Sequence, residues 1–490
     1  MHVHRGRSIR LPAERGLFYG GRFHAAARST PLTSPVDGSA LGVVADATAA
    51  EVDSAVAAAQ AAFPAWRDLP PLARADRLRA LAALMRTHRD ELALIDALDG
   101  GNPVAEMRRD VEMSVRGIEY FAGLAQELKG ESVPLGPNLL NYSRREPYGV
   151  VARIIAYNHP LMFATLRAAA PLAAGNTLIV KPPEQAPLSV LRLAELIAAA
   201  DILPPGVFNV VPGGRECGER LVGHPQVRRI AFIGSVPTGR VIMRGAADSV
   251  KSVSLELGGK NALIAYPDMA PTRIADGIIK GMNFTWAGQS CGSTSRVFLH
   301  ERQHDEVVAL VLERLAAYVP GDPTDDATTM GALIDARQLA KVEGFVRAGL
   351  EDGAVLAAGG RRVRPVGLEQ GCYFEPTVFT GVTPTMRLAR EEVFGPVVAI
   401  LKWRDEDAMF ADVNSVEYGL SAAIYARDLA VAHRAAARVE AGYVWINEAS
   451  MHYLGTPFGG VKQSGMGREE AFEELLGSTQ IKTVTVSLEP

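Results

Sequence analysis

The sequence predicts an α/β protein built around parallel sheets that helices cover on both faces. From Gly149 onward, short apolar runs such as GVVARIIA, NTLIVKP and GVFNVVPG alternate with helix-like runs such as LSVLRLAELIAAA, a rhythm typical of βαβ units. The composition supports an ordinary globular chain, because 48% of its 490 residues are hydrophobic and 22% are charged. This length suggests roughly two to four domains, and the composition excludes disorder.

Charge and cysteine content narrow the class of protein. A net charge of −4 gives no basic surface for nucleic acid or for an anionic membrane. Three scattered cysteines do not make a disulfide framework, which indicates a reducing compartment. The first sixteen residues lack the apolar core of a secretory signal, and Asn158, Pro160 and Arg167 interrupt the longest apolar region, Ile154–Val180. We therefore expect a cytoplasmic protein with a small-molecule partner.

The elements can be followed along the chain. The Ala-rich stretches Ala47–Ala62 and Leu72–Leu94 have the pattern of amphipathic helices. A second α/β rhythm follows Gly258, where helix-like stretches such as Ala336–Leu350 separate runs such as SRVFLH, YFEPTVFTGV and VVAILKW. Two isolated strand-like runs, NYSRREP at 141–147 and STQIKTVTVSL near the end, either pair as an edge or extend between subunits. Exposed edges invite pairing with another chain, which favours oligomerisation.

Cys291 is the candidate nucleophile. It lies in Gly288–Ser295, a run of small residues that leaves the thiol reachable, as a nucleophile that approaches a substrate carbon requires. A buried structural cysteine is the alternative, since that is the usual state of a free thiol. Cys217, which heads an amphipathic helix, and Cys372, which precedes an aromatic strand, are interpreted as structural.

Charged residues at strand ends are the next candidates. Glu256 interrupts the apolar strand SVSLELGGK; burial would raise the pKa of this carboxyl, as suits a general base, and a water-facing edge position is the alternative. Lys181 ends the strand NTLIV and precedes Pro182, Pro183 and Glu184. Ligands bind at such ends of open parallel sheets, so Lys181 and Glu184 could hold ribose hydroxyls; a solvated charged turn is the alternative.

Two further patterns are weaker. Phe232–Gly239 runs from a strand into a helix with two glycines and Ser235, which would let a pyrophosphate approach, although a plain turn has the same pattern. His300–His304 matches the H-E-x-x-H zinc pattern. Because His300 ends a strand, its imidazole and that of His304 should not share a helical face, and no metal site is predicted.

Together, the motifs resemble those of the NAD(P)-dependent aldehyde dehydrogenase superfamily, from about Leu32 to Lys482. In chain order they are Asn158-His159-Pro160, Lys181-Pro182-Pro183-Glu184, Phe232-x-Gly234-Ser235, Glu256-Leu257-Gly258-Gly259-Lys260, Gly288-Gln289-Ser290-Cys291, Glu392-Val393-Phe394-Gly395-Pro396, Asn414, Tyr418-Gly419-Leu420, Asn447 and Pro457-Phe458-Gly459-Gly460-x-Lys462-x-Ser464-Gly465. One motif is a modest signal, whereas the complete set in register is specific. The resemblance favours catalytic roles for Cys291 and Glu256.

The resemblance implies a mechanism with Cys291, Glu256, Asn158 and Lys181 as the catalytic set. The Cys291 thiolate would attack the aldehyde carbon, and the Asn158 amide with the Cys291 backbone N–H would hold the oxyanion. Hydride transfer to a nicotinamide would leave a thioester, which water activated by Glu256 would hydrolyse. Glu184 would repel a 2′-phosphate, so NAD is the expected cofactor and NADP the alternative.

The resemblance also assigns two sets of binding residues. The expected cofactor contacts are Ile154, Tyr157, Lys181, Glu184, Gly214, Phe232, Gly234, Ser235, Leu257, Glu392 and Phe394. The expected substrate channel is lined by His159, Met162, Phe163, Leu166, Thr285, Ser290, Glu448, His452 and Phe458. This mixed lining favours a polar or aromatic aldehyde, and histidines that merely pack are the alternative. Two positions depart from the family pattern, since Ala156-Tyr157 replaces the frequent Pro-Trp and Trp286 replaces an asparagine.

The implied architecture is aldehyde dehydrogenase-like. It has a Rossmann-type NAD-binding domain in residues 1–130 and 149–256, an α/β catalytic domain in 257–465, and a small β extension in 131–148 and 466–490. The extension would join subunits into a homodimer or homotetramer. Two other activities stay open: a CoA-acylating semialdehyde dehydrogenase, against which Glu256 argues, and a thiol esterase without redox chemistry.

Overall fold

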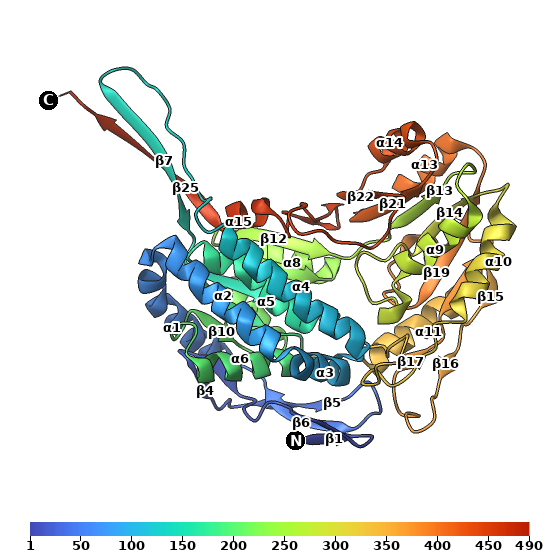
Figure 1. Cartoon of the computed structure of the whole chain (residues 1–490), viewed down its shortest axis with the longest axis horizontal. Coiled ribbons are helices and arrows are strands. Elements are labelled where there is room, and N and C mark those ends of the chain that lie inside the picture. The colour runs from blue at the N-terminus through green and yellow to red at the C-terminus, as the bar shows by residue number, and fades with distance from the viewer. Residues whose placement is uncertain (490) are drawn as a thin grey trace.

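Two sheets form the centres of two lobes in the computed structural model, which describes residues 1–489 (Figure 1). The first sheet has the strand order β24-β12-β11-β8-β9-β10-β3-β4. Its strands span, in that order, Gly465–Met466, Ser252–Leu257, Val227–Gly234, Val150–Ile154, Thr177–Lys181, Phe208–Val210, Leu17–Tyr19 and Arg22–His24. Strands β12 to β10 run parallel, and β24 and β3 join them antiparallel.

Alternating side chains of the first sheet serve two helical layers. Val151 packs into one core, whereas its neighbours Val150 and Ala152 pack into the other, as the period of two in a strand requires. The Val151 face is covered by α2 (Pro71–Thr87), α3 (Arg89–Gly100), α4 (Val104–Gly123), α5 (Pro160–Ala173) and α6 (Leu188–Ala200). The opposite face is covered by α1 (Ala49–Asp68), α7 (Arg215–Gly223) and α8 (Val236–Ala247).

The second sheet repeats this arrangement with the order β15-β18-β19-β14-β13-β21-β22. Its strands span Val355–Ala358, Thr377–Thr380, Val397–Trp403, Arg296–His300, Ala262–Ala265, Ser421–Tyr425 and Tyr443–Ile446. All but β15 run parallel. One face packs on α9 (Pro271–Met282) and α10 (His304–Leu315), the other on α11 (Ala336–Glu351), α12 (Arg387–Arg390), α13 (Glu406–Asn414) and α14 (Leu429–Arg438). Both sheets have parallel central strands and helices on both faces, as predicted.

The two isolated strands pair with each other. Strand β7 (Leu139–Pro147) runs antiparallel to β25 (Thr479–Ser487), from Pro147 opposite Thr479 to Leu139 opposite Ser487. The ribbon projects from the first lobe, and the short helix α15 (Phe472–Gly477) leads into it (Figure 1). Of the two predicted alternatives, the two strands pair with each other within the chain. They form one two-stranded arm from residues more than three hundred positions apart.

Smaller pairs complete the fold, and one helix prediction was wrong. The pairs are β1 (His2–His4) with β2 (Arg7–Ile9), β5 (Ser29–Thr33) with β6 (Ala40–Ala45), β16 (Arg362–Val363) with β17 (Tyr373–Phe374), and β20 (Tyr418–Gly419) with β23 (Val461–Lys462). The stretch Leu72–Leu94 is not one helix, because His88 leaves helical geometry and separates α2 from α3. No helix within residues 1–489 combines the length and the apolar character that crossing a bilayer would need.

Candidate active site

The expected cofactor residues lie along one edge of the first sheet. Ile154 ends β8 opposite both Lys181, which ends β9, and Phe232 of β11. Gly234 ends β11 opposite Leu257, which ends β12. Carboxyl ends of parallel strands form the crevice in which open α/β sheets bind ligands, so local strand ends become one shared surface.

The helices that follow these strands fit a dinucleotide. Ser235 precedes α8, but its hydroxyl bonds that of Thr238 at 3.1 Å and caps no backbone N–H, which leaves the helix N-terminus available to a phosphate. At the start of α7, a Cβ built on Gly214 would lie 3.7 Å from the Glu184 carboxylate. Such a Cβ on Gly218 would lie 3.8 Å from Cε of Lys181, so Lys181 and Glu184 approach the same helical turns.

Glu392 and Phe394 are held beside this edge by close backbone contacts. Oε1 of Glu392 accepts a hydrogen bond from the Gly259 N–H at 3.0 Å, and any Cβ on Gly258 would overlap Oε2. Phe394 has a φ of +54°, and the Gln338 amide donates to its carbonyl at 2.7 Å. The rings of Tyr157 and Phe394 meet edge to face with centroids 5.8 Å apart, so Tyr157 still presents an aromatic ring where the family often has tryptophan.

The loop that carries Cys291 follows the short 3-10 turn η1 (Phe284–Trp286) and enters β14. Gly288 has a φ of +69°, and a Cβ there would overlap the Gly395 carbonyl oxygen, so only glycine lets this loop approach the Phe394 segment. The Gln289 side chain spans the loop base, donating to the Ala332 carbonyl at 3.1 Å and accepting from the Ile334 N–H at 3.0 Å. Trp286, where an asparagine is usual, leaves this packing intact.

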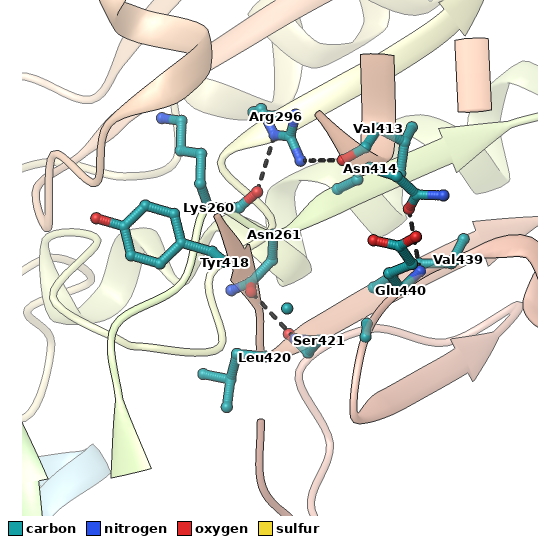
Figure 2. Close-up of a pocket in the computed structure, with 14 residues that line it drawn as sticks. Lys260, Asn261, Arg296, Val413, Asn414, Tyr418, Leu420, Ser421, Val439 and Glu440 are labelled. Carbon is teal, nitrogen blue, oxygen red and sulfur yellow. Dashed lines mark hydrogen bonds between the residues drawn. The ribbon is translucent and has the colours of Figure 1, made fainter. Parts of the chain in front are cut away.

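Asn261 anchors the cysteine itself from behind. Its amide nitrogen donates to the Cys291 carbonyl at 2.6 Å and to the Ser293 carbonyl at 3.0 Å. Its amide oxygen accepts from the Ser421 N–H at 3.1 Å, a contact seen in the cavity that Figure 2 shows between β13, β14 and β21. Arg296 closes the same cavity by donating to the Lys260 carbonyl at 2.8 Å. The loop that carries Cys291 is therefore fixed to the second sheet.

The charge of Glu256 acts on the Cys291 thiol. Burial and then the charge of Glu256 raise the pKa of the Cys291 thiol to about 12. Glu256 is buried in β12, with Oε1 2.8 Å from a Cβ built on Gly459, and neither carboxylate oxygen has a hydrogen-bond partner within residues 1–489. Burial and the nearby Glu469 raise the pKa of this carboxyl well above its usual value. A thiol with a raised pKa therefore lies within electrostatic reach of a carboxylate that has no hydrogen-bond partner in residues 1–489.

Asn158 lies between β8 and α5. Its carbonyl accepts a hydrogen bond from the Asn102 amide at 2.8 Å, which fixes the backbone of this buried residue. In the first turn of α5, the backbone N–H of Leu161 donates a hydrogen bond to Oδ2 of Asp96 at 3.4 Å. A side chain from α3 therefore holds the start of the helix. Asn158 is therefore presented on a rigid helix start at the end of a central strand, a suitable place for an oxyanion donor.

The expected channel residues come from α5, the cysteine loop and the segment after β22. His159, Phe163 and Leu166 share one face of α5, and a Cβ on Gly117 would touch both Leu166 and Leu454. The rings of His452 and Phe458 are tilted by 42° to each other, with centroids 4.4 Å apart. Met162 packs partly buried on the first core, Ser290 lies next to Cys291, and Thr285 accepts from the Gly331 N–H at 3.1 Å. Glu448 instead pairs with Lys280.

A buried ionic cluster behind Glu256 was not predicted. Arg153 donates to Glu469 and to Glu474, each at 2.6 Å, and Arg167 donates to Glu470 at 2.6 Å. All five side chains are buried, and burial with the charge of Glu469 raises the pKa of Glu474 to about 7. Arg167 in an otherwise apolar helix was the sequence signal for such a cluster, but its partners lie about three hundred residues away.

The zinc-like pattern does not form a site. His300 ends β14 and His304 begins α10, so the two imidazoles lie on different elements. Within the described part of the chain, no three His, Cys, Asp or Glu side chains are grouped as metal ligands. Cys217 and Cys372 are buried and carry no disulfide.

The ends of parallel strands β9, β11 and β12 lie at one edge of the first sheet, beside a helix N-terminus that no side chain caps, an arrangement typical of proteins that bind a dinucleotide. The model of the aldehyde dehydrogenase family matches residues 23–484. Aldehyde dehydrogenase tropH from Talaromyces stipitatus is 48% identical, and the match covers 98% of this chain and 94% of that protein. An NAD+ complex of aldehyde dehydrogenase from Bacillus cereus superposes with a TM-score of 0.94 at 37% identity, over 97% of each chain. A structure titled as an NADP-dependent enzyme from E. coli superposes at 0.93 with 34% identity, over 97% of this chain and 98% of that one.

The chain belongs to the aldehyde dehydrogenase family. It is an NAD(P)-dependent enzyme that oxidises aldehydes, which confirms the predicted class, fold and cofactor type.

Proposed function

We propose that the enzyme converts an aldehyde to the carboxylic acid with NAD, through a thiohemiacetal and then a thioester on Cys291. The observation that carries this proposal is the Glu256 carboxylate, which is buried without a hydrogen-bond partner among residues 1–489. Burying a carboxylate in this way is costly. Lone pairs left unoccupied are, however, what a general base needs to take a proton from a thiol or from water.

The first step needs this base because burial keeps Cys291 protonated at neutral pH. Glu256 accepts the thiol proton, directly or through a water, while sulfur bonds to the aldehyde carbon and the carbonyl oxygen gains the negative charge. The side-chain amide of Asn158 and the backbone N–H of Cys291 stabilise that oxyanion. The Asn261 side-chain amide keeps the Cys291 backbone in place by donating a hydrogen bond to the Cys291 carbonyl.

The cofactor site is proposed on the chain's own groups. Lys181 and Glu184 hold the adenosine ribose, Ser235 and the N-terminus of α8 hold the pyrophosphate, and Glu392 orients the nicotinamide ribose. Bound NAD supplies the hydride acceptor. Lys341 is added to this proposed site, because desolvation raises the pKa of the partly buried Glu392 carboxyl and the positive charge of Lys341 lowers it.

Glu256 then completes the reaction with water. It accepts a proton as the water oxygen attacks the thioester carbonyl, the carbon–sulfur bond breaks, and the Cys291 sulfur regains a proton. A base poised for water supports hydrolysis over transfer to CoA. The mixed lining of His159, Phe163, His452 and Phe458 supports a polar or aromatic aldehyde.

We extend the proposal to the assembly. The first sheet with its helices forms the NAD-binding domain, the second sheet the catalytic domain, and the β7–β25 ribbon the oligomerisation arm. Apolar side chains on this arm are exposed, including Leu140 at 45% and Ile481 at 63%, which supports a homodimer or homotetramer. Three free thiols support a cytoplasmic location. Light scattering should show a larger assembly that Ile481→Lys reduces in mass.

NADH formation from a panel of aldehydes tests the proposal. Short aliphatic, aromatic, hydroxylated and semialdehyde substrates are supplied with NAD or NADP, in the presence and absence of CoA. Turnover should vanish in Cys291→Ala and persist in Cys372→Ala, a matched loss of a buried thiol. An acyl-CoA product, or ester cleavage without any NADH formation, would contradict it.

A further inference from the structure

Two histidines of the expected channel each bind a carboxylate through Nδ1. Nδ1 of His159 lies 2.6 Å from Oδ2 of Asp110, and Nδ1 of His452 lies 3.0 Å from both carboxylate oxygens of Glu470. Asp110 and Glu470 are only 6% and 5% exposed. A carboxylate bound to Nδ1 fixes the ring orientation and leaves Nε2 as the group that can meet a ligand.

The cysteine loop touches both rings. Trp286, before Cys291, meets His159 edge to face with centroids 5.2 Å apart. Gly292, directly after Cys291, would place a Cβ 3.9 Å from Nε2 of His452. Both imidazoles therefore lie close to the segment from Trp286 to Gly292 that carries Cys291.

Neither Nε2 atom forms a hydrogen bond within residues 1–489. The His452 side chain is 30% exposed, whereas that of His159 is 10% exposed. Burial lowers the pKa of His159, but the charge and hydrogen bond of Asp110 outweigh it, so the net shift is upward. This shift favours a doubly protonated ring, whose Nε2–H donates toward the channel.

Aromatic rings lie beside both histidines of the expected channel. The Phe163 ring lies 5.4 Å from His159, the Phe458 ring lies 4.4 Å from His452, and Tyr443 stacks nearly parallel to His452 at 6.2 Å. Such walls suit a planar carbon skeleton. The two nearest carboxylates are already engaged, because Asp110 binds His159 and Glu470 binds both His452 and Arg167.

We propose that His159 and His452 select an aromatic or unsaturated aldehyde that carries a second, anionic oxygen function, and this inference rests on the proposed function. A carboxylate and an ionised hydroxyl share the chemistry that an imidazole N–H recognises. Aldehyde and anion would then be held at opposite ends of a flat molecule, with the aldehyde carbon at Cys291.

Four benzaldehydes of similar shape test the inference by kcat/KM with NAD. They are 4-formylbenzoate, its uncharged near-isostere 4-formylbenzamide, 4-hydroxybenzaldehyde and benzaldehyde. A fifth compound, 4-(trimethylammonio)benzaldehyde, is the cationic comparison. A charge-assisted hydrogen bond should give a preference of about 10–100-fold for an anionic substrate over benzaldehyde. A preference for the benzoate over the benzamide identifies a carboxylate, and a preference for the phenol identifies a hydroxyl.

Variants assign the preference to the two rings. His159→Phe and His452→Phe should each reduce this ratio of kcat/KM values about tenfold or more, through a higher KM for the anionic substrate. His88→Phe is the matched control, because Nδ1 of His88 lies 2.9 Å from Glu91 in an equivalent pair outside the channel. Asp110→Asn should weaken the preference with rising pH, since it removes the charge that favours protonated His159.

Inhibition of benzaldehyde oxidation by terephthalate, an unreactive dianion, is a second readout. It should be competitive in the wild type and weaker in His452→Phe. Equal turnover of all four aldehydes, preference for the cation, or a preference that survives both histidine replacements would overturn the inference alone. No NADH from any aldehyde would instead reject the proposed function and the inference with it.

Discussion

Replacing Gly288 by alanine should slow the enzyme without unfolding it. Gly288 combines a φ of +69° with a Cβ position that overlaps the Gly395 carbonyl oxygen. Alanine would add about 1–3 kcal/mol of backbone strain, and clearing the overlap requires a movement of about 1 Å. The movement falls on the loop of Cys291 or on the segment of Phe394, and a misplacement of that size costs about 10²-fold in rate. We expect kcat/KM to fall by about that factor.

The assay combines NADH formation with the rate at which iodoacetamide alkylates Cys291, which reports on the thiol without a cofactor. Gly353→Ala is the matched control, because Gly353 has a φ of +89° and nothing within 4 Å of its Cβ position. It carries the backbone strain without the overlap and should keep wild-type kinetics. Wild-type kcat/KM and alkylation in Gly288→Ala would refute the reasoning.

Three further outcomes are expected. Glu256→Gln should lose about 10²–10⁴-fold in kcat/KM. The wild-type rate should rise with pH as the raised pKa of Glu256 is passed, because the base form of the carboxyl then appears. The pH profile of the variant should lack this rise. Arg153→Met should cost about 3–5 kcal/mol of unfolding free energy in denaturant, because it leaves Glu469 and Glu474 buried with one cation fewer; a loss below about 1 kcal/mol would contradict this. That cost should shrink at lower pH, as Glu474 takes up a proton near pH 7. Glu184→Ser should raise kcat/KM with NADP relative to NAD by about tenfold, because it removes a like charge from the 2′-phosphate, and an unchanged ratio would place Glu184 away from the ribose.

Local patterns predicted much of the fold and the family, whereas the catalytic roles of the site residues stay a prediction. A strand and its end are encoded within five to eight neighbouring residues, so the apolar runs that end at Lys181, Gly234 and Glu256-Leu257 located the sheet edge correctly. The small residues around Cys291 likewise form the loop that packs on Gly395. The break at His88 was missed because helical periodicity continues across it, and only the backbone geometry shows the turn.

The sequence by itself determined the local position of each candidate residue. It showed which residues end strands, which begin helices, and which thiol is flanked by small side chains. Only the tertiary structure decided which partner each group meets. Asp110 orients His159, Glu470 orients His452, and β25 pairs with β7, across separations from tens to hundreds of residues. The physical reason is that periodicity states which face of an element is buried, whereas the charge placed opposite that face depends on how distant elements pack.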